Sequence, residues 1–183
     1  MINFENLDKE RIYLGLQYSS GNFISDTIKK CTKMYAPESK EIPTHVFALV
    51  YRLGGWWIYE SHHKPHSRFD VPAGVRRFRQ EIWSMAEENN LQTFKAYPLD
   101  ISFLWLEEYI GRPYGVGDIK ELYKAWLKKS NGKQKDQKGL ICSEYIAMCY
   151  KPITDFFELP AWCITPAHFQ CYLDKLGIES VSE

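Results

Sequence analysis

A cysteine, a histidine and a glutamate in this sequence could together perform covalent chemistry. Cys142 lies between a polar, glycine-containing stretch and an apolar run that favours a helix. Exposed backbone N–H groups and the positive end of a helix dipole favour a thiolate at such a place, and the same N–H groups could hold an oxyanion. Free cysteine is also often a small core residue, so a buried structural thiol is the alternative. Cys149 lies about two helical turns further along the same apolar face, where we expect a core residue.

His45 is the candidate base for that thiol, because a thiol nucleophile needs a base and histidine is the usual one. It stands at the start of a predicted strand, on the same face as Phe47. If the turn that follows has an even number of loop residues, Glu60 falls on this face of the paired strand. Its carboxylate would then hold the imidazole in orientation. A buried histidine with other partners and a glutamate in solvent are the alternatives.

Three further histidines, His62, His63 and His66, crowd the loop after that strand. His62 and His66 have the spacing of helical metal ligands, but Pro65 between them disfavours a helix, and no second cluster offers ligands at a familiar spacing. We therefore expect a solvated loop or a substrate-binding rim, and no metal site. A zinc-binding protein is the competing hypothesis, and it predicts stoichiometric zinc in the purified protein.

The remaining pattern predicts the elements that must position these residues. A hairpin is predicted with strands at residues 44–51 and 56–60 around the turn Arg52-Leu53-Gly54-Gly55. A further strand is predicted at 92–99, and a strand or turn at 71–79. Helices are predicted at 25–34, 101–109, 118–129 and 143–149, the last one stopped by Pro152, with a polar surface loop at 128–139. Helices that flank mainly antiparallel strands indicate an α+β fold.

The composition fits a single folded domain over residues 1–183. The chain has 183 residues, of which 45% are hydrophobic and 25% charged, and this share is too apolar for a disordered chain. Its 23 basic residues balance 23 acidic ones, which gives a formal net charge of zero. A nucleic-acid binder usually has a basic excess, because Lys and Arg neutralise phosphates, so we expect no nucleic-acid partner.

We expect no membrane span, export signal or disulfide framework. No apolar stretch approaches the roughly 20 residues needed to cross a bilayer. Residues 1–11 alternate acidic and apolar side chains and lack the basic-then-apolar order of a signal peptide, which predicts a cytoplasmic protein. The cysteines number five and include no C-x-x-C pair, which argues against both a disulfide framework and a zinc ribbon.

Three segments, taken together and in their order, resemble the circularly permuted NlpC/P60 hydrolases of the YiiX/YebB-like group. They read THVFALV at residues 44–50, WIYES at 57–61 and LICSEY at 140–145. Ordinary members of the family carry the cysteine before the histidine, whereas here the histidine and the acid come first, as in the permuted branch. The stretch GRPY at 111–114 is similar to the family's Gly-x-Pro-Tyr element, although Gly115 follows it where the family often has Asp. The resemblance covers about residues 19–152.

The resemblance implies a circularly permuted papain-like fold of the α+β class, in which a small antiparallel sheet packs against helices. It also implies roles: Cys142 as the nucleophile, His45 as the general base and Glu60 as the residue that orients the histidine. Tyr114 would donate a hydroxyl to the oxyanion or shape the pocket. No metal or organic cofactor is implied. The expected reaction is cleavage of an amide or acyl ester through an acyl-enzyme, on a cell-wall-type peptide or an acyl or lipid conjugate.

A non-catalytic module on the same scaffold is the alternative function. Such a module would bind a lipid or small ligand without turnover, because a fold does not fix a function and aromatic residues crowd the proposed cleft. These residues are Phe47, Tyr51, Trp56, Trp57 and Tyr59. In either case the partner is a small-molecule, peptide or acyl compound, and the sequence indicates no oligomeric state. Residues 153–183 match no part of the family, and we expect a C-terminal cap or extension there.

Overall fold

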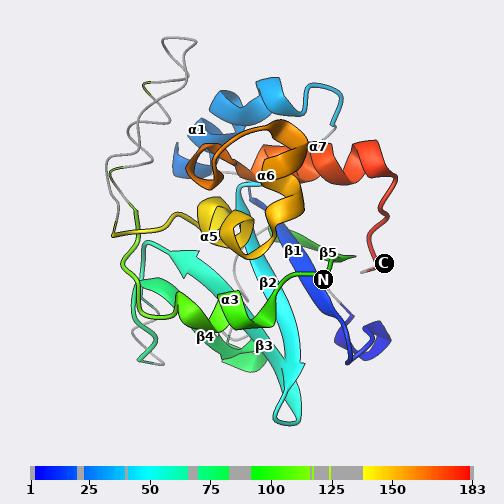
Figure 1. Ribbon diagram of the computed structural model, residues 1–183, viewed down its shortest axis with the longest axis vertical. Coiled ribbons are helices and arrows are strands. Elements are labelled where there is room, and N and C mark those ends of the chain that lie inside the picture. Colours follow the sequence, from blue (N-terminus) through cyan, green and yellow to red (C-terminus); the bar gives the residue numbers. More distant parts are fainter. Residues whose placement is uncertain are drawn as a thin grey trace.

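The computed structural model combines one sheet with several helices (Figure 1). It describes residues 3–19, 23–39, 41–65, 70–82, 92–115, 117, 124 and 138–181. The strands are β1 (Ile12–Ser19), β2 (His45–Arg52), β3 (Gly55–His62), β4 (Gly74–Arg79) and β5 (Gln92–Pro98). The α-helices are α1 (Phe23–Thr32), α3 (Phe103–Glu108), α5 (Cys142–Cys149), α6 (Lys151–Phe157) and α7 (Pro166–Leu176). Short 3-10 turns are η1 (Phe4–Asn6), η2 (Lys33–Tyr35) and η4 (Ala161–Cys163).

The five strands form one antiparallel sheet in the order β4-β3-β2-β1-β5. The central strand, β2, is apolar on both faces, because alternate side chains of a strand point to opposite sides. Val46 and Ala48 belong to a core on one side, and Phe47 and Leu49 belong to a second core on the other. β2 is therefore fixed from both sides, which gives its first residue, His45, a rigid support.

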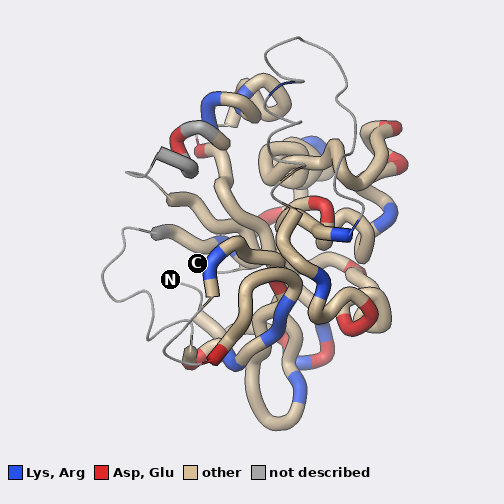
Figure 2. The backbone as a smooth tube through the Cα atoms, turned by 90° about the vertical axis from the view of Figure 1, so that its left-hand side faces the viewer, with Lys and Arg blue, Asp and Glu red and all other residues tan. Residues whose placement is uncertain are grey.

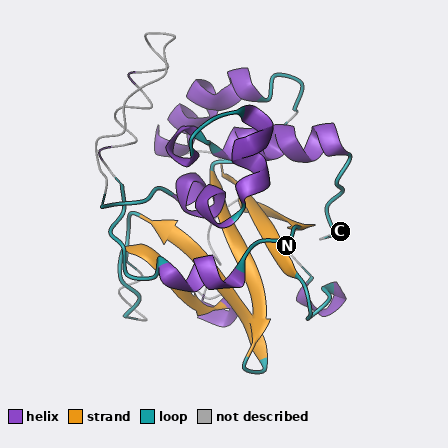
Figure 3. Ribbon diagram, in the orientation of Figure 1, coloured by secondary structure: helices purple, strands orange, loops and turns teal. Residues whose placement is uncertain are grey.

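The larger core lies between the sheet and the helices. α3 contributes Leu106, α5 contributes Ile146, α6 contributes Ile153 and α7 contributes Phe169, and all four are fully buried. Burial of such apolar surface, at about 25 cal/mol per Å², is what holds the helices on the sheet. Figure 3 shows the helices gathered beside the sheet, and α5 packs against β2 and β3. The fold is therefore α+β, with an antiparallel sheet packed against helices.

The predicted hairpin is confirmed. β2 and β3 pair antiparallel and are joined by Leu53 and Gly54, whose φ values are 50° and 75°. A two-residue hairpin turn needs positive φ, which glycine adopts at no steric cost. The loop has an even number of residues, so the condition under which Glu60 shares a face with His45 is met.

Most other predicted elements that fall on described residues are also confirmed. The predicted strand at 92–99 is β5, and the segment at 71–79 contains β4. The helices predicted at 25–34, 101–109 and 143–149 correspond to α1, α3 and α5. The helix predicted at 118–129 and the loop predicted at 128–139 lie almost wholly outside the described residues.

Two features differ from the sequence-based expectation. No strand is predicted before residue 44, yet β1 lies between β2 and β5 and buries Leu14 and Leu16. Pro152 is expected to stop a helix, but α5 already ends at Cys149, and the proline lies in the first turn of α6. Proline is tolerated there because the first N–H groups of a helix have no intrahelical acceptor.

Charge is spread over the molecule rather than gathered on one side. Figure 2 shows basic and acidic positions interspersed along the described backbone, as the formal net charge of zero suggests. In the described part of the chain, no helix has both the length and the apolar character needed to cross a bilayer.

Candidate active site

Cys142 is the first residue of α5 and is 7% exposed. Leu140, just before the helix, is held on both sides: its N–H donates to the carbonyl of Pro113 at 2.9 Å, and its carbonyl accepts from Ser61 Oγ at 2.5 Å. Gly139 makes this approach possible, because a Cβ there would lie 2.8 Å from the backbone of the neighbouring segment. These contacts fix where α5 begins, and therefore where the thiol lies.

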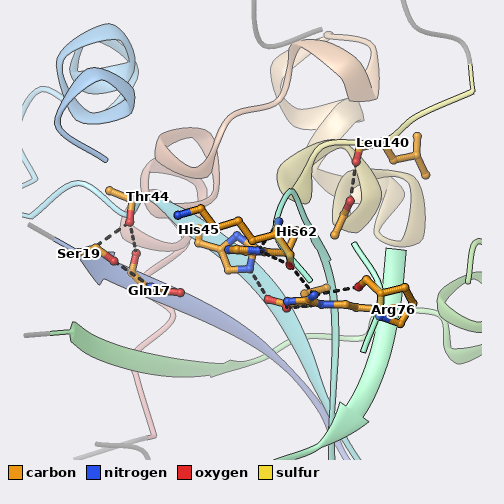
Figure 4. A network of polar contacts seen from close by, with 11 residues as sticks. Gln17, Ser19, Thr44, His45, His62, Arg76 and Leu140 are labelled. Carbon is orange, nitrogen blue, oxygen red and sulfur yellow. Dashed lines mark hydrogen bonds and ion pairs between the residues drawn. The ribbon is translucent and has the colours of Figure 1, made fainter. Parts of the chain in front are cut away.

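His45 of β2 and Glu60 of β3 meet across these neighbouring strands, and Figure 4 shows the polar contacts around His45. Ala48 lies opposite Tyr59, and continuing this register brings Phe47 opposite Glu60. His45 is two residues from Phe47 on the same face, which places it diagonally beside the carboxylate. Nε2 of His45 lies 2.7 Å from Oε2 of Glu60, and the two side chains are only 12% and 5% exposed. Water therefore competes little for this contact.

Cys142 is the second partner of the His45 imidazole. Because Glu60 engages Nε2, Nδ1 is the ring nitrogen available to exchange a proton with the thiol. Burial disfavours the charged ring, but the charge of Cys142 and a side-chain hydrogen bond with it, followed by the same interactions with Glu60, raise the pKa of His45 to about 10. The site therefore stabilises an imidazolium beside Cys142, and an imidazolium can pair with a thiolate.

Glu60 is held as a carboxylate. Its burial would raise the pKa, but a hydrogen bond from His45 and the charges of His45, His62 and Arg76 hold the pKa of Glu60 far below its usual value. Arg76, 2% exposed, donates to Oε1 from Nε at 2.8 Å and from Nη2 at 2.5 Å. The carboxylate thus uses one oxygen for the arginine and the other for the histidine.

Tyr114 reaches the site on an irregular segment. The N–H of Val75 donates to the carbonyl of Arg112 at 2.8 Å, so this segment runs beside the start of β4. Burial, and then the charges of Cys142 and Glu60, raise the pKa of Tyr114 well above its ordinary value. The hydroxyl therefore stays protonated and is a hydrogen-bond donor near the thiol.

The histidines after β3 lie along the same side of the site. The ring of His62 meets that of His45 edge-on at 5.5 Å and stacks on His63 at 4.7 Å, and His63 lies 5.8 Å from Tyr114. Burial lowers the pKa of His62 to about 4, so this ring is neutral at pH 7. His66 lies outside the described residues, and no group of three His, Cys, Asp or Glu side chains within them could hold a metal ion.

The structure brings together the residues that the sequence singled out, namely Cys142, His45, Glu60 and Tyr114. Their chemical roles stay predictions. Arg76 was missed, although it lies directly opposite Glu60 in the pairing of β3 with β4. The signal was an arginine in a segment of strand character next to the glutamate's strand, since opposite charges often face each other across strands.

No protein-family model matches this sequence, and a search of curated proteins also finds no match. The site is therefore interpreted from its own geometry.

Proposed function

We propose that the protein is a cysteine hydrolase that cleaves an amide or acyl-ester bond. Cys142 is the nucleophile, His45 the general base and acid, and Glu60 the residue that orients the imidazole. One observation carries this proposal: His45 has a carboxylate 2.7 Å from Nε2, and the same ring interacts with Cys142. A thiol, an imidazole and a carboxylate in this sequence of contacts are the parts of a nucleophilic triad.

The reaction proceeds in two half-reactions. The Cys142 thiolate attacks the carbonyl carbon, and His45 gives a proton to the leaving amine or alcohol as the C–N or C–O bond breaks. A thioester remains on the cysteine. His45 then takes a proton from water, the resulting hydroxide attacks the thioester, and the C–S bond breaks to release the acid. Tyr114 supports the oxyanion in both steps, because its protonated hydroxyl lies near the thiol.

The permuted papain-like fold is part of the same proposal. It is supported by the chain order His45, Glu60, Cys142 and by a nucleophile at the start of a helix that packs on an antiparallel sheet. The substrates proposed are a cell-wall-type peptide or an acyl or lipid conjugate, on the resemblance to the permuted family.

Alkylation of Cys142 by iodoacetamide, followed by peptide mass spectrometry, tests the activated thiol without knowledge of the substrate. We expect fast labelling of Cys142 near neutral pH, and labelling at least about tenfold slower in His45→Ala. Cys149 serves as the internal control, because it is buried among apolar side chains and should stay unlabelled in the folded protein.

Equal labelling of Cys142 in wild type and His45→Ala would contradict the proposal. The alternative, a module that binds a lipid or small ligand without turnover, would then account better for the site. Slow labelling of Cys142 in both proteins would lead to the same conclusion.

A further inference from the structure

Arg76 is the most deeply buried cation in the described part of the site. Its side chain is 2% exposed, and its guanidinium makes four hydrogen bonds. Two go to Oε1 of Glu60, from Nε and Nη2, and two go from Nη1 to the carbonyls of Lys64 at 2.7 Å and Pro72 at 2.9 Å. Figure 4 shows this side chain extending from β4 toward the part of the site where His45 and His62 lie.

The way Arg76 binds Glu60 determines what the carboxylate can do. Both donors end on Oε1, so Oε2 is left to receive His45 at 2.7 Å. Because Glu60 and Arg76 are paired residues of β3 and β4, the backbone itself sets this geometry. The planar guanidinium supplies a fixed fork of donors, which a lysine ammonium does not.

We propose that Arg76 is a positioning residue, which acts through Glu60 to hold the His45 imidazole toward Cys142. The inference rests on the proposed function, since it assigns a residue to the same site. The hydrogen bonds of Arg76 go to Glu60 and to the backbone of Lys64 and Pro72, and Glu60 is the side chain that links it to the imidazole. A buried ion pair is a poor device for stability alone, because desolvation offsets much of its attraction.

Arg76 also fixes the end of β3. The carbonyls of Lys64 and Pro72 both accept from Nη1, so a single group holds the backbone on both sides of the intervening segment. Nδ1 of His62 in turn lies 3.1 Å from the N–H of Lys64 and 3.2 Å from its carbonyl oxygen, so the same segment also contacts this ring. Among the described residues, the titratable or charged groups near Glu60 include His45 from β2, His62 from its own strand and Arg76 from β4. His63 and Tyr114 also interact with its charge.

The test follows the rate of Cys142 alkylation by iodoacetamide from about pH 4 to pH 9 in folded variants. In Arg76→Met we expect the rate near neutral pH to fall about 100-fold, as a displaced catalytic group typically causes. A new decrease should also appear on the acid side, because Glu60 without its arginine takes up a proton at higher pH. Arg76→Lys keeps the positive charge but loses the planar set of guanidinium donors. Cys142 should therefore be alkylated more slowly than in wild type, but without the additional decrease at acid pH.

The matched control is Arg77→Met, one residue along the same strand. Arg77 is 37% exposed and pairs with Glu107 on the opposite face of β4, so its loss should leave the rate and its pH dependence unchanged. If Arg76 acts through Glu60, then Arg76→Met should change the rate less than about twofold when Glu60→Gln is already present.

Independent, multiplying effects of Arg76→Met and Glu60→Gln would overturn the proposal, and so would an Arg76→Lys variant with the wild-type rate and profile. Where Arg76→Met fails to fold, Arg76→Lys and the double variant decide the question, because neither leaves a buried carboxylate without its cation. If His45→Ala slows the alkylation of Cys142 but the Arg76 variants do not, only this inference is refuted. If His45→Ala alkylates Cys142 as fast as wild type does, the proposed function itself is refuted.

Discussion

The two cysteines of α5 differ in their surroundings and hardly in their burial. Cys142 begins the helix and is 7% exposed, and Cys149 ends it and is 3% exposed. The His45 imidazole lies beside Cys142, whereas burial and then the charge of Glu108 raise the pKa of Cys149. Burial alone therefore does not decide whether a thiol can react. The polar groups packed against the thiol decide whether it can react.

Two buried histidines teach the same lesson. His168 is 2% exposed and accepts the N–H of Thr165 on Nδ1 at 3.0 Å, and burial lowers its pKa to about 4. His45, despite its burial, has its pKa raised to about 10 by Cys142 and Glu60. The His168 ring, which caps a helix, stays neutral at pH 7, whereas the interactions of His45 with Cys142 and Glu60 favour its charged form.

Removal of each α5 thiol in turn gives the largest expected difference between the two ends of the helix. In Cys142→Ala we expect hydrolysis of an activated acyl ester, such as p-nitrophenyl acetate, to fall at least about 10⁴-fold, because no nucleophile remains. In Cys149→Ala the rate should match wild type, and the free energy of unfolding should fall by about 1 kcal/mol. Measured kcat and urea unfolding check both. Equal hydrolysis rates in Cys142→Ala and Cys149→Ala would contradict the assignment of Cys142 as the nucleophile.

The pKa values of His45 and His168 should respond very differently when Cys142 is replaced. In Cys142→Ser the pKa of His45 should fall clearly, because the interactions with Cys142 that do most to raise it are lost. The pKa of His168 should stay where it is, since that ring has no contact with the thiol. Titration of the imidazole C–H signals by NMR measures both rings in one sample. A His45 pKa unaffected by the replacement would mean that the two side chains do not interact.

Acid should destabilise the protein through His168. Its folded-state pKa of about 4 lies below the unfolded value of 6.5, so the unfolded chain binds the proton first and stability is lost as pH falls between these values. From pH 7 to pH 5 this one group should cost about 2 kcal/mol of unfolding free energy. Urea unfolding of wild type and His168→Gln at both pH values isolates the contribution. Equal losses in the two proteins would show that His168 is not its source.

The part of this site that could be predicted from the sequence is the part that local patterns determine. A two-residue turn with Gly54 sets the register of β2 and β3, and this register is what brings Glu60 to His45. The start of α5 follows from an apolar run after a polar stretch, which is why Cys142 could be placed at a helix N-terminus.

The features that the sequence analysis missed are Arg76 and β1. They depend on contacts between residues far apart in the sequence, or on burial that is unusual for the residue type. Arg76 is buried, whereas arginine is normally exposed, and the hydrogen bonds from Nη1 to Lys64 and Pro72 become visible only when β3 and β4 are paired. β1 lies between β2 and β5, and β5 follows it by more than 70 residues, so neither neighbour is fixed by a local turn.

The smallest expected effect on the site is that of replacing Ser61. It distinguishes the positioning of Cys142 from the stability of the whole protein. Ser61 Oγ donates to the carbonyl of Leu140 at 2.5 Å, and Tyr145 donates its hydroxyl to the carbonyl of Leu106 at 2.8 Å, both in buried surroundings. Ser61→Ala and Tyr145→Phe should each cost about 1–2 kcal/mol of unfolding free energy. Only Ser61→Ala should slow the alkylation of Cys142, by about threefold to tenfold, because only Ser61 fixes the backbone that leads into the thiol. Equal slowing in both variants would mean that Cys142 responds to stability in general, and the two ends of α5 would then differ less than their contacts imply.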